Sequence, residues 1–318
     1  MNKRIVAMPF RHHASHVSAE ARKLLTDAGF ELRCNDTGRI LTSEEQHEMI
    51  KDACAVIAGT EKYSAEMLAG CDNLRVIVRF GVGCDNFDLA AMKQRGIRVG
   101  VIANYNAVAE YTVMLMLAAM KNYPRHERAV RRGEWARFPM REISGKTVGL
   151  IGFGRIGRRV AELLSGFGVK LLVYDPYAAS EVLEAHHAKG TEPDVLLAES
   201  DIVSLHLPSS AETRHFINAE RIAQMKDGAV LINTARGALV DEAALVAALQ
   251  SGKLYAAGID VFEREPVTAD VPLLSVENTA LSPHCAAITY ETNFNGGMTC
   301  AESILRVLEG GDPVYPVV

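Results

Sequence analysis

The sequence predicts an α/β protein made of two doubly wound parallel-sheet domains. Two observations support this prediction. Short apolar runs alternate with amphipathic helical stretches along almost all of the 318 residues, and one of these runs leads directly into a glycine-rich turn. Alternating strands and helices indicate βαβ units, in which helices cover both faces of a parallel sheet. A chain of this length is long enough for two domains with separate hydrophobic cores.

The first part of the chain contains five β-rich runs separated by helical patterns. Strands are expected at 4–8, 30–34, 55–58, 75–80 and 97–101, and helices near 17–28, 43–52, 64–69 and 88–94. A longer helix is expected at about 107–122. Its apolar stretch, Tyr111 to Met120, is shorter than the roughly 20 residues that a membrane span requires. We therefore interpret it as a buried or subunit-interface helix, followed by an irregular passage with Gly133, Pro139 and Gly145.

The alternation restarts at Lys146, where a strand leads into a glycine fingerprint. Further strands are expected at 171–174, 202–206, 229–233, 256–260 and 279–281, with helices at 158–167 and about 297–309. Gly152 allows a tight turn, Gly154 lets a pyrophosphate approach the backbone, and Gly157 lets the following helix pack closely on the strand. The first amides of that helix, at Arg155 and Ile156, face the phosphates. This unit is therefore predicted to be a Rossmann nucleotide domain.

Asp175 indicates which dinucleotide is bound. It lies 18 residues beyond Gly157, at the end of the next strand. A carboxylate there can accept hydrogen bonds from the adenosine ribose and repels a 2′-phosphate, so NAD is the expected cofactor. An aspartate that only caps a turn is the structural alternative. The shorter turn Gly81-Val82-Gly83 lacks a third glycine and predicts a site for a smaller anion, such as a substrate carboxylate, rather than a second dinucleotide.

Three chemically useful side chains follow later strands of the second sheet. Arg236, Glu265 and His284 lie near its carboxyl edge, where open α/β sheets bind ligands. Reduction of a 2-keto acid needs a bidentate donor for the acid group, a proton donor for the ketone oxygen, and a group that keeps this donor charged. Taken singly, each residue has a structural alternative: an arginine in a surface loop, a glutamate before a proline in a turn, and a histidine at a strand end.

The order of these segments resembles the D-isomer-specific 2-hydroxyacid dehydrogenases over nearly the whole chain. The resemblance rests on the glycine fingerprint with Asp175 and on the segments 205–208, 233–237, 260–266 and 282–284. It implies that Arg236, Glu265 and His284 form the catalytic set. It also implies a flavodoxin-like substrate/catalytic domain at 1–104 and 289–318, a Rossmann domain at 105–288, a cofactor in the cleft between the two, and an active homodimer.

The resemblance also implies roles for further residues. With Arg236, the substrate is expected to contact Arg79, Val82 and Gly83, while Asn104 marks a hinge between the domains. The residues expected to bind NAD are Gly152, Gly154, Arg155, Ile156, Gly157, Asp175, His206, Pro208, Thr234, Ala235 and Asp260.

The expected function is NAD-dependent interconversion of a small (R)-2-hydroxy acid and its 2-keto acid, with the stereochemistry taken from the resemblance. The segments 58–61 and 79–86 are most similar to phosphoglycerate dehydrogenase-type members. Many of those carry a regulatory C-terminal domain, which is not expected here because the sequence ends at Val318. Glyoxylate or hydroxypyruvate reduction is the alternative within the class. An NAD-sensing corepressor is the alternative from another class, and Glu265 argues against a formate dehydrogenase, which carries glutamine there.

Bulk properties argue against other partners and compartments. A net charge of −5, a pI near 6.1 and the lack of a basic run predict no nucleic-acid partner. No signal segment or membrane span is expected, and six scattered cysteines without a CxxC pair favour reduced thiols in the cytoplasm. No metal is expected, because the histidines His12, His13 and His16 lack a ligand partner at zinc-like spacing. Cys285 is expected to be a small buried side chain rather than a nucleophile.

Overall fold

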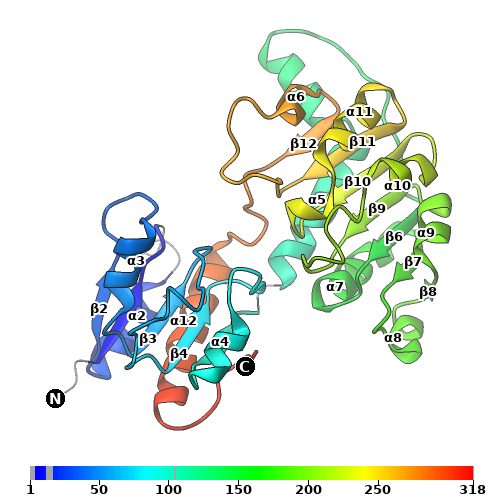
Figure 1. The fold of residues 1–318 in the computed structure, drawn as a ribbon. Coiled ribbons are helices and arrows are strands. Elements are labelled where there is room, and N and C mark those ends of the chain that lie inside the picture. Colours follow the sequence, from blue (N-terminus) through cyan, green and yellow to red (C-terminus); the bar gives the residue numbers. More distant parts are fainter. Residues whose placement is uncertain (1–3, 12–16, 104, 318) are drawn as a thin grey trace. The chain divides into compact units, whose positions relative to one another are not determined.

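The computed structural model describes residues 4–11, 17–103 and 105–317. The chain forms two compact units (Figure 1): unit 1 comprises Met1–Asn104 and Ala287–Val318, and unit 2 comprises Tyr105–Ala286. Each unit is a parallel sheet covered by helices, so the predicted fold class is confirmed. Asn104 and the histidines His12, His13 and His16 lie outside the described residues.

Unit 1 contains a five-stranded parallel sheet in the order β2-β1-β3-β4-β5, the flavodoxin-like order. Its strands are β1 (Ile5–Met8), β2 (Glu31–Cys34), β3 (Ala55–Ala58), β4 (Val76–Arg79) and β5 (Arg98–Val101). Every residue of β1 and β3 is buried, as expected for inner strands covered on both faces.

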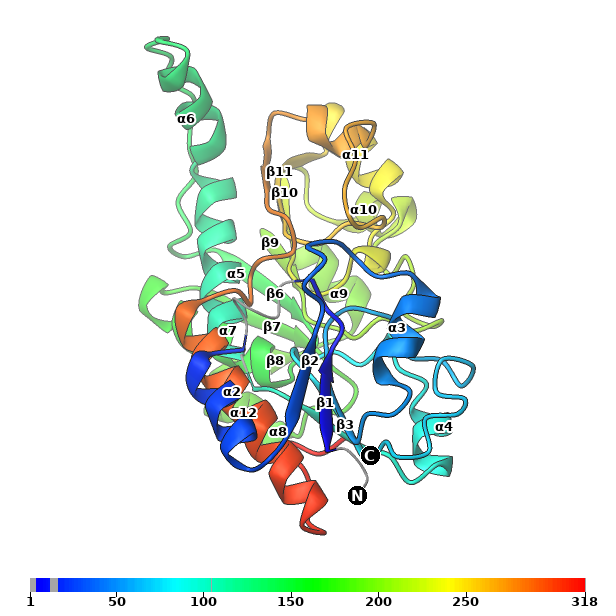
Figure 2. The same cartoon turned by 90° about the vertical axis from the view of Figure 1, so that its left-hand side faces the viewer.

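Helices cover the two faces of this sheet separately, as Figure 2 shows. The helices α2 (Ala19–Asp27) and α12 (Tyr290–Leu308) pack against each other and build one core with the strands. The helices α3 (Ser43–Ile50) and α4 (Leu89–Gln94) build the other core, around Ile50 and Met92. The last helix of the chain therefore packs on unit 1.

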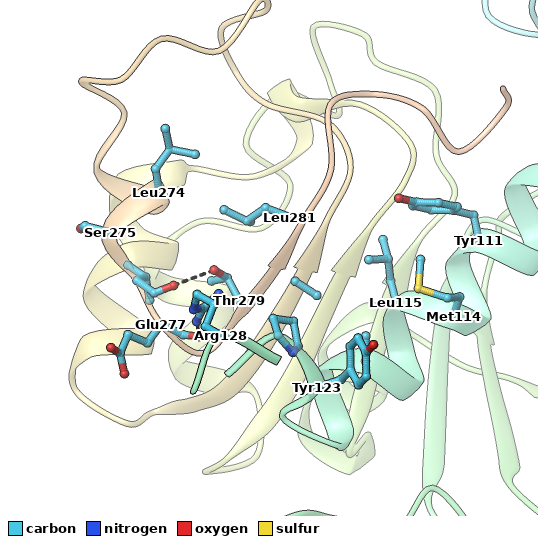
Figure 3. A pocket seen from close by; sticks show the side chains of 14 residues that line it. Tyr111, Met114, Leu115, Tyr123, Arg128, Leu274, Ser275, Glu277, Thr279 and Leu281 are labelled. Atoms are coloured by element: carbon cyan, nitrogen blue, oxygen red, sulfur yellow. Dashed lines mark hydrogen bonds between the residues drawn. The ribbon is translucent and has the colours of Figure 1, made fainter. Parts of the chain in front are cut away.

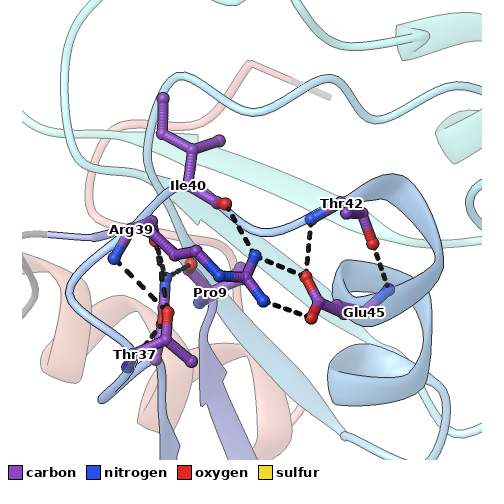
Figure 4. Close-up of polar contacts among 7 residues, drawn as sticks. Pro9, Thr37, Arg39, Ile40, Thr42 and Glu45 are labelled. Carbon is purple, nitrogen blue, oxygen red and sulfur yellow. Dashed lines mark hydrogen bonds and ion pairs between the residues drawn. The ribbon is translucent and has the colours of Figure 1, made fainter.

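The start of α3 is fixed by a capping box (Figure 4). The Thr42 hydroxyl accepts a hydrogen bond from the Glu45 N–H at 3.3 Å, and the Glu45 carboxylate accepts one from the Thr42 N–H at 2.8 Å. Arg39 donates to both oxygens of the same carboxylate. The hydrogen bonds from Arg39 and then Thr42 lower the pKa of Glu45 to about 2, so this cap persists far into the acid range.

Unit 2 contains a seven-stranded parallel sheet in the order β12-β11-β10-β9-β6-β7-β8, which is the nucleotide-binding order with one added edge strand. The strands are β6 (Thr147–Ile151), β7 (Lys170–Tyr174), β8 (Ala188–Gly190), β9 (Ile202–Leu205), β10 (Ala229–Asn233), β11 (Leu254–Ile259) and β12 (Thr279–Leu281). The strand order reverses between β6 and β9, beside the glycine turn that follows β6. Such a reversal is where open α/β sheets form a ligand crevice.

The helices of unit 2 also form two layers. On one face, α5 (Tyr105–Met120) and α7 (Arg155–Leu164) pack on the strands around Met116 and Val160. On the other lie α9 (Pro193–Glu199), α10 (Ala219–Gln224) and α11 (Glu242–Gln250). The short helix α8 (Ser180–Ala185) precedes β8. Among the described residues, every helix is either too short or too polar to traverse a lipid bilayer.

Several predicted boundaries were wrong. The expected helix at 64–69 is a series of turns ended by Gly70, whose φ is +76°. The passage after α5 contains an unpredicted helix, α6 (Tyr123–Arg131), which follows a left-handed Asn122 and carries proline in its first turn. The expected helix near 297 starts at Tyr290, because Thr289 caps it and Gly296 and Gly297 lie inside it, where they allow close packing.

Candidate active site

The glycine turn after β6 has the geometry that a dinucleotide requires. Gly152 has a φ of +97°, and a Cβ there would lie 2.7 Å from the His206 carbonyl. A Cβ on Gly157 would lie 2.4 Å from the Gly152 carbonyl oxygen, whereas at Gly154 none of the described atoms lies within 4 Å of that position. Gly154 is the N-cap of α7 and makes no side-chain cap hydrogen bond. The backbone at Gly154 is therefore open, next to a helix N-terminus that can bind phosphate.

Asp175 reaches the same turn from the end of β7. Its carboxylate accepts hydrogen bonds from the Phe153 N–H at 2.7 Å and from the Tyr177 N–H at 2.9 Å. The residue therefore does cap a turn, as the structural alternative supposed. A carboxylate has about four acceptor positions, so two of them are left for a ribose. Capping and ribose binding are compatible, and the ribose role stays a prediction.

His206 lies on the opposite side of this turn, after β9. Its N–H donates to the Ile151 carbonyl at 2.7 Å, and its Nε2 lies 3.0 Å from the Ser204 hydroxyl. Burial lowers the pKa of His206 to about 4, so the ring is neutral at physiological pH. Pro208 follows on an exposed segment, where its carbonyl accepts a hydrogen bond from Thr213.

His284 and Glu265 form a hydrogen-bonded pair, with Nδ1 2.7 Å from Oε2. The other Glu265 oxygen accepts from the Phe262 N–H at 3.0 Å. Burial acts to raise the pKa of Glu265, but the hydrogen bond from His284, the charges of His284 and Arg236 and the Phe262 amide outweigh it, so the pKa is lowered. Because Glu265 is an anionic acceptor, Nδ1 carries the hydrogen, and Nε2 is the nitrogen left for a ligand.

Asp260, at the end of β11, holds the loop that carries His284. Its side chain is fully buried and accepts from the Ser282 hydroxyl at 2.6 Å, the Cys285 N–H at 2.9 Å and the Ala286 N–H at 3.0 Å. Its carbonyl accepts from the His284 N–H at 2.7 Å, and His284 has a left-handed φ of 53°. From the sequence, Asp260 was expected to contact only the cofactor. The segment Ser282–Ala286 offers three donors, but their approach to Asp260 depends on the pairing of β11 with β12.

Arg236 lies on a loop that is fixed at both ends. Asn233 closes the loop by donating to the Arg236 carbonyl at 2.8 Å, and the Arg236 guanidinium donates to the Ala235 carbonyl at 2.7 Å. A Cβ on Gly237 would lie 1.9 Å from the Phe262 carbonyl oxygen, so the loop packs directly on the backbone of the segment that carries Glu265. The structure thus brings Arg236, Glu265 and His284 to one edge, after the neighbouring strands β10, β11 and β12.

The hydroxyl group of Thr234, in the same loop, has a fixed orientation. Its Oγ1 lies 2.7 Å from the Thr112 Oγ1, and Thr112 donates its own hydrogen to the Val108 carbonyl at 2.7 Å. The Thr234 hydroxyl must therefore be the donor in this pair, because each hydroxyl has a single hydrogen. Its remaining lone pairs are acceptors.

Cys285 is partly exposed, in contrast to the expected buried side chain. Its Sγ lies 3.4 Å from the Tyr111 hydroxyl, and burial is the main cause that raises the pKa of the thiol. A thiol with a raised pKa is a poor nucleophile. Within the described residues, no three His, Cys, Asp or Glu side chains gather as a metal ion would require.

The residues expected to contact substrate from the first half of the chain lie in unit 1. Arg79 ends β4 and donates to the Phe80 carbonyl at 2.8 Å, while Val82 is exposed and Gly83 half-buried on the turn that follows. Their contact with a substrate stays a prediction.

Unit 2 also contains a pocket of about 370 Å³ on another part of its surface (Figure 3). Tyr111, Met114 and Leu115 of α5 line one side of it, and the segment around Leu274 and Glu277 lines the other. It lies beside β12, the strand that leads to His284, and none of the glycine-turn residues lines it. This pocket is therefore not the nucleotide site.

The fold and the glycine turn define a class of dinucleotide-binding proteins, and comparison with known proteins identifies the family. Residues 113–286 match the family model of the D-isomer specific 2-hydroxyacid dehydrogenase, NAD binding domain. The chain belongs to the D-isomer specific 2-hydroxyacid dehydrogenases, as the resemblance predicted, and NAD is the cofactor of the matched domain.

The chain matches different shares of the length of its relatives. The chain is 38% identical over 305 residues to a D-3-phosphoglycerate dehydrogenase of Archaeoglobus fulgidus, covering 93% of this chain and 57% of that protein. It is 39% identical over 279 residues to a hydroxypyruvate reductase of Thermotoga maritima, covering 86% of this chain and 90% of that protein. The chain thus spans little more than half the length of the phosphoglycerate dehydrogenases of Archaeoglobus fulgidus and Methanocaldococcus jannaschii.

Solved structures agree with the fold. The TT0316 protein of Thermus thermophilus superposes with a TM-score of 0.88 at 32% identity, covering 99% of this chain and 100% of that one. D-Lactate dehydrogenase of Aquifex aeolicus, solved with NAD and lactic acid, gives a TM-score of 0.82 at 31% identity, covering 96% of both chains.

Proposed function

We propose that the protein is an NAD-dependent dehydrogenase that interconverts a small (R)-2-hydroxy acid and its 2-keto acid. One observation carries the proposal. The His284–Glu265 pair, joined at 2.7 Å, lies within range of the Arg236 charge at the carboxyl edge of a nucleotide-binding sheet. A proton donor, its charge partner and a carboxylate-binding cation are the groups that this chemistry needs.

In the reductive direction, Arg236 binds the substrate carboxylate through two parallel charge-assisted hydrogen bonds. NADH, when bound, supplies the hydride that reaches the keto carbon. His284, as imidazolium, donates the Nε2 proton to the keto oxygen, while Glu265 holds Nδ1 and stabilises the charged ring. The neutral histidine accepts the proton back when the hydroxy acid is oxidised.

The glycine turn and the residues around it fit NAD. We assign the pyrophosphate to the backbone at Gly152, Gly154 and Gly157, together with the first amides of α7 at Arg155 and Ile156, and the ribose to Asp175. The segments after β9, β10 and β11 are assigned to the remainder of the cofactor. Their residues are His206, Pro208, Thr234, Ala235 and Asp260.

Two substrate classes remain within the proposed reaction. A phosphoglycerate dehydrogenase-like activity is the first, supported by relatives with that name at 38% and 42% identity. Hydroxypyruvate or glyoxylate reduction is the second, supported by relatives that the chain covers to 90% and 83% of their length. In both cases we assign contacts with the substrate to Arg79, Val82 and Gly83.

We further propose a homodimer in the cytoplasm. Large apolar side chains are exposed along α5, α6 and the segment after them, and exposed apolar patches mark interfaces. They are Met114, Tyr123, Val130, Trp135 and Met140, of which Trp135 is 82% exposed. The six free cysteines suit a reducing compartment. Sedimentation of the wild-type protein and of Trp135→Ser tests the dimer.

The test of the reaction is NADH oxidation with glyoxylate, hydroxypyruvate, phosphohydroxypyruvate, pyruvate and oxaloacetate, ranked by kcat/KM. His284→Ala is the control and is expected to lose about 10²–10⁴-fold in kcat while still binding NADH. Turnover of at least one keto acid excludes a non-catalytic corepressor role. Binding of NADH without reduction of any of the five would refute the proposal.

A further inference from the structure

A second pair of opposite charges lies in unit 1, at the carboxyl edge of its sheet. Strands β3 and β4 are neighbours, with Ala58 paired to Arg79 in register, so the segments that leave them start at the same level. Glu61 follows β3, and Arg79 is the last residue of β4. Ligands of open α/β sheets bind beyond this edge.

The Glu61 carboxylate is folded back over the end of its own strand. It accepts a hydrogen bond from the Gly59 N–H at 2.9 Å, and a Cβ on Gly59 would lie 2.8 Å and 3.0 Å from its two oxygens. Asn86 donates to the Glu61 carbonyl and fixes the backbone. The absence of a side chain at Gly59 therefore makes room for a carboxylate at this position.

The Arg79 guanidinium lies over the turn after β4 in the same way. A Cβ on Gly81 would lie 3.1 Å from its Cζ and its Nη1. Burial is the main cause that raises the pKa of Glu61, and the Arg79 charge acts in the opposite direction. On the segments 9–11, 59–62 and 79–86, which leave β1, β3 and β4, only these two charged side chains are not exposed.

The net charge of the partly buried side chains at this edge decides which acids can bind there. Exposed charges are screened by water and salt, whereas partly buried charges act strongly on a nearby ligand. A phosphate group carries about −1.5 to −2 charges at pH 7, so a nearby carboxylate repels it and a cation attracts it. On the described segments 9–11, 59–62 and 79–86, the charge of the partly buried Arg79 is opposed by that of the partly buried Glu61 carboxylate.

We propose that Glu61 is a specificity-determining residue that disfavours phosphorylated substrates, so that the protein acts on keto acids with an uncharged side chain. The inference rests on the proposed function and narrows its two candidate substrate classes to the unphosphorylated one. It opposes the substrate that the similarity of segment 58–61 to phosphoglycerate dehydrogenase-type members predicted.

The test compares hydroxypyruvate with phosphohydroxypyruvate, because these keto acids differ only in the phosphate group. The wild-type protein is expected to have the higher kcat/KM with hydroxypyruvate. Glu61→Gln keeps the size of the side chain and an acceptor for the Gly59 N–H but removes the charge. It is expected to raise kcat/KM for the phosphorylated keto acid by about tenfold or more, and to change that for hydroxypyruvate by less than about threefold.

Glu66→Gln is the matched control, because Glu66 is exposed and lies five positions further along the chain. It removes the same charge and is expected to leave the ratio of the two kcat/KM values unchanged. Inhibition of the wild-type enzyme provides a test that needs no variant: D-3-phosphoglycerate is expected to inhibit hydroxypyruvate reduction more weakly than D-glycerate does.

The outcomes separate this inference from the proposed function. A wild-type protein that prefers the phosphorylated keto acid, or a folded Glu61→Gln variant with an unchanged ratio, overturns the role of Glu61 and leaves the dehydrogenase intact. If Glu61→Gln does not fold, the role of Glu61 is tested by the inhibition of the wild-type protein by D-3-phosphoglycerate and D-glycerate. Failure of the wild-type protein to reduce any of the five keto acids, while it binds NADH, rejects the dehydrogenase itself.

Discussion

Replacing Glu265 with glutamine tests the acid–base pair most directly. The change removes one charge and leaves a single oxygen to accept from both His284 Nδ1 and the Phe262 N–H, which lie 2.7 Å and 3.0 Å from the two carboxylate oxygens. A hydrogen bond between charged partners contributes about 1.5–3 kcal/mol. Since both side chains are partly exposed, we take the lower half of this range, which corresponds to roughly 10–50-fold in kcat/KM near neutral pH.

The dependence on pH gives the sign of the effect. The pKa of Glu265 is lowered, so its contact with charged His284 is present above that pKa and is lost as the pH falls through it. In the variant, the imidazolium has no anionic partner. Since glutamine cannot ionise, this contact is missing at every pH, and the loss of kcat/KM relative to the wild-type protein is expected to be largest above the pKa of Glu265 and to diminish as the pH falls towards it.

The assay is NADH oxidation at saturating cofactor across pH 5–9. Glu263→Gln is the matched control, because Glu263 lies two positions away and pairs with a different histidine, His215, at 2.5 Å. It is expected to leave the wild-type pH profile of kcat/KM unchanged. Coincident pH profiles for wild-type and Glu265→Gln proteins would show that Glu265 does not act through His284.

Other variants test the cofactor and substrate contacts. Asp175→Ala is expected to narrow the preference for NADH over NADPH, and unchanged selectivity in kcat/KM would remove the ribose assignment. Arg236→Lys is expected to raise KM for keto acids steeply, because lysine cannot form two parallel hydrogen bonds, and wild-type kcat/KM would contradict this role. Gly154→Ala has open space for its methyl group, so Tm is expected to stay constant while the Kd of NADH rises at least about tenfold. Gly157→Ala instead places a methyl group 2.4 Å from the Gly152 carbonyl and is expected to cost about 1–3 kcal/mol of stability in thermal unfolding.

The sequence predicted those features that depend on local pattern. Continuous apolar runs such as Val76–Val78 predicted the buried strands, and the glycine fingerprint predicted the turn at Gly152. Helix ends were harder to predict. The last helix was expected to start near Gly297, but α12 starts at Tyr290 and contains Gly296 and Gly297 where it crosses Ile102 and the backbone of Ser18. Packing against distant segments overrides helix propensity at such positions.

The sequence predicted which residues form the candidate site, but it did not predict the hydrogen bonds that hold them. Arg236, Glu265 and His284 could be singled out because each follows a strand. The contacts of Asp260 with Ser282, Cys285 and Ala286 depend on the register of β11 with β12, which places Ile259 opposite Leu281. Such a register is set by the whole sheet, so no local pattern predicts which donors a buried carboxylate meets.

The origin of Arg236, Glu265 and His284 from adjacent strands of one sheet has a consequence for the timing of catalysis. Their mutual arrangement is completed when that sheet folds and the Asp260 carboxylate closes the last loop, before any reactant arrives. The free energy needed to orient the proposed proton donor, His284, is therefore supplied during folding rather than in each turnover. In a variant with weaker Asp260 contacts, His284 would have to be oriented during each turnover. Its kcat is therefore expected to fall even when NADH and the keto acid bind normally.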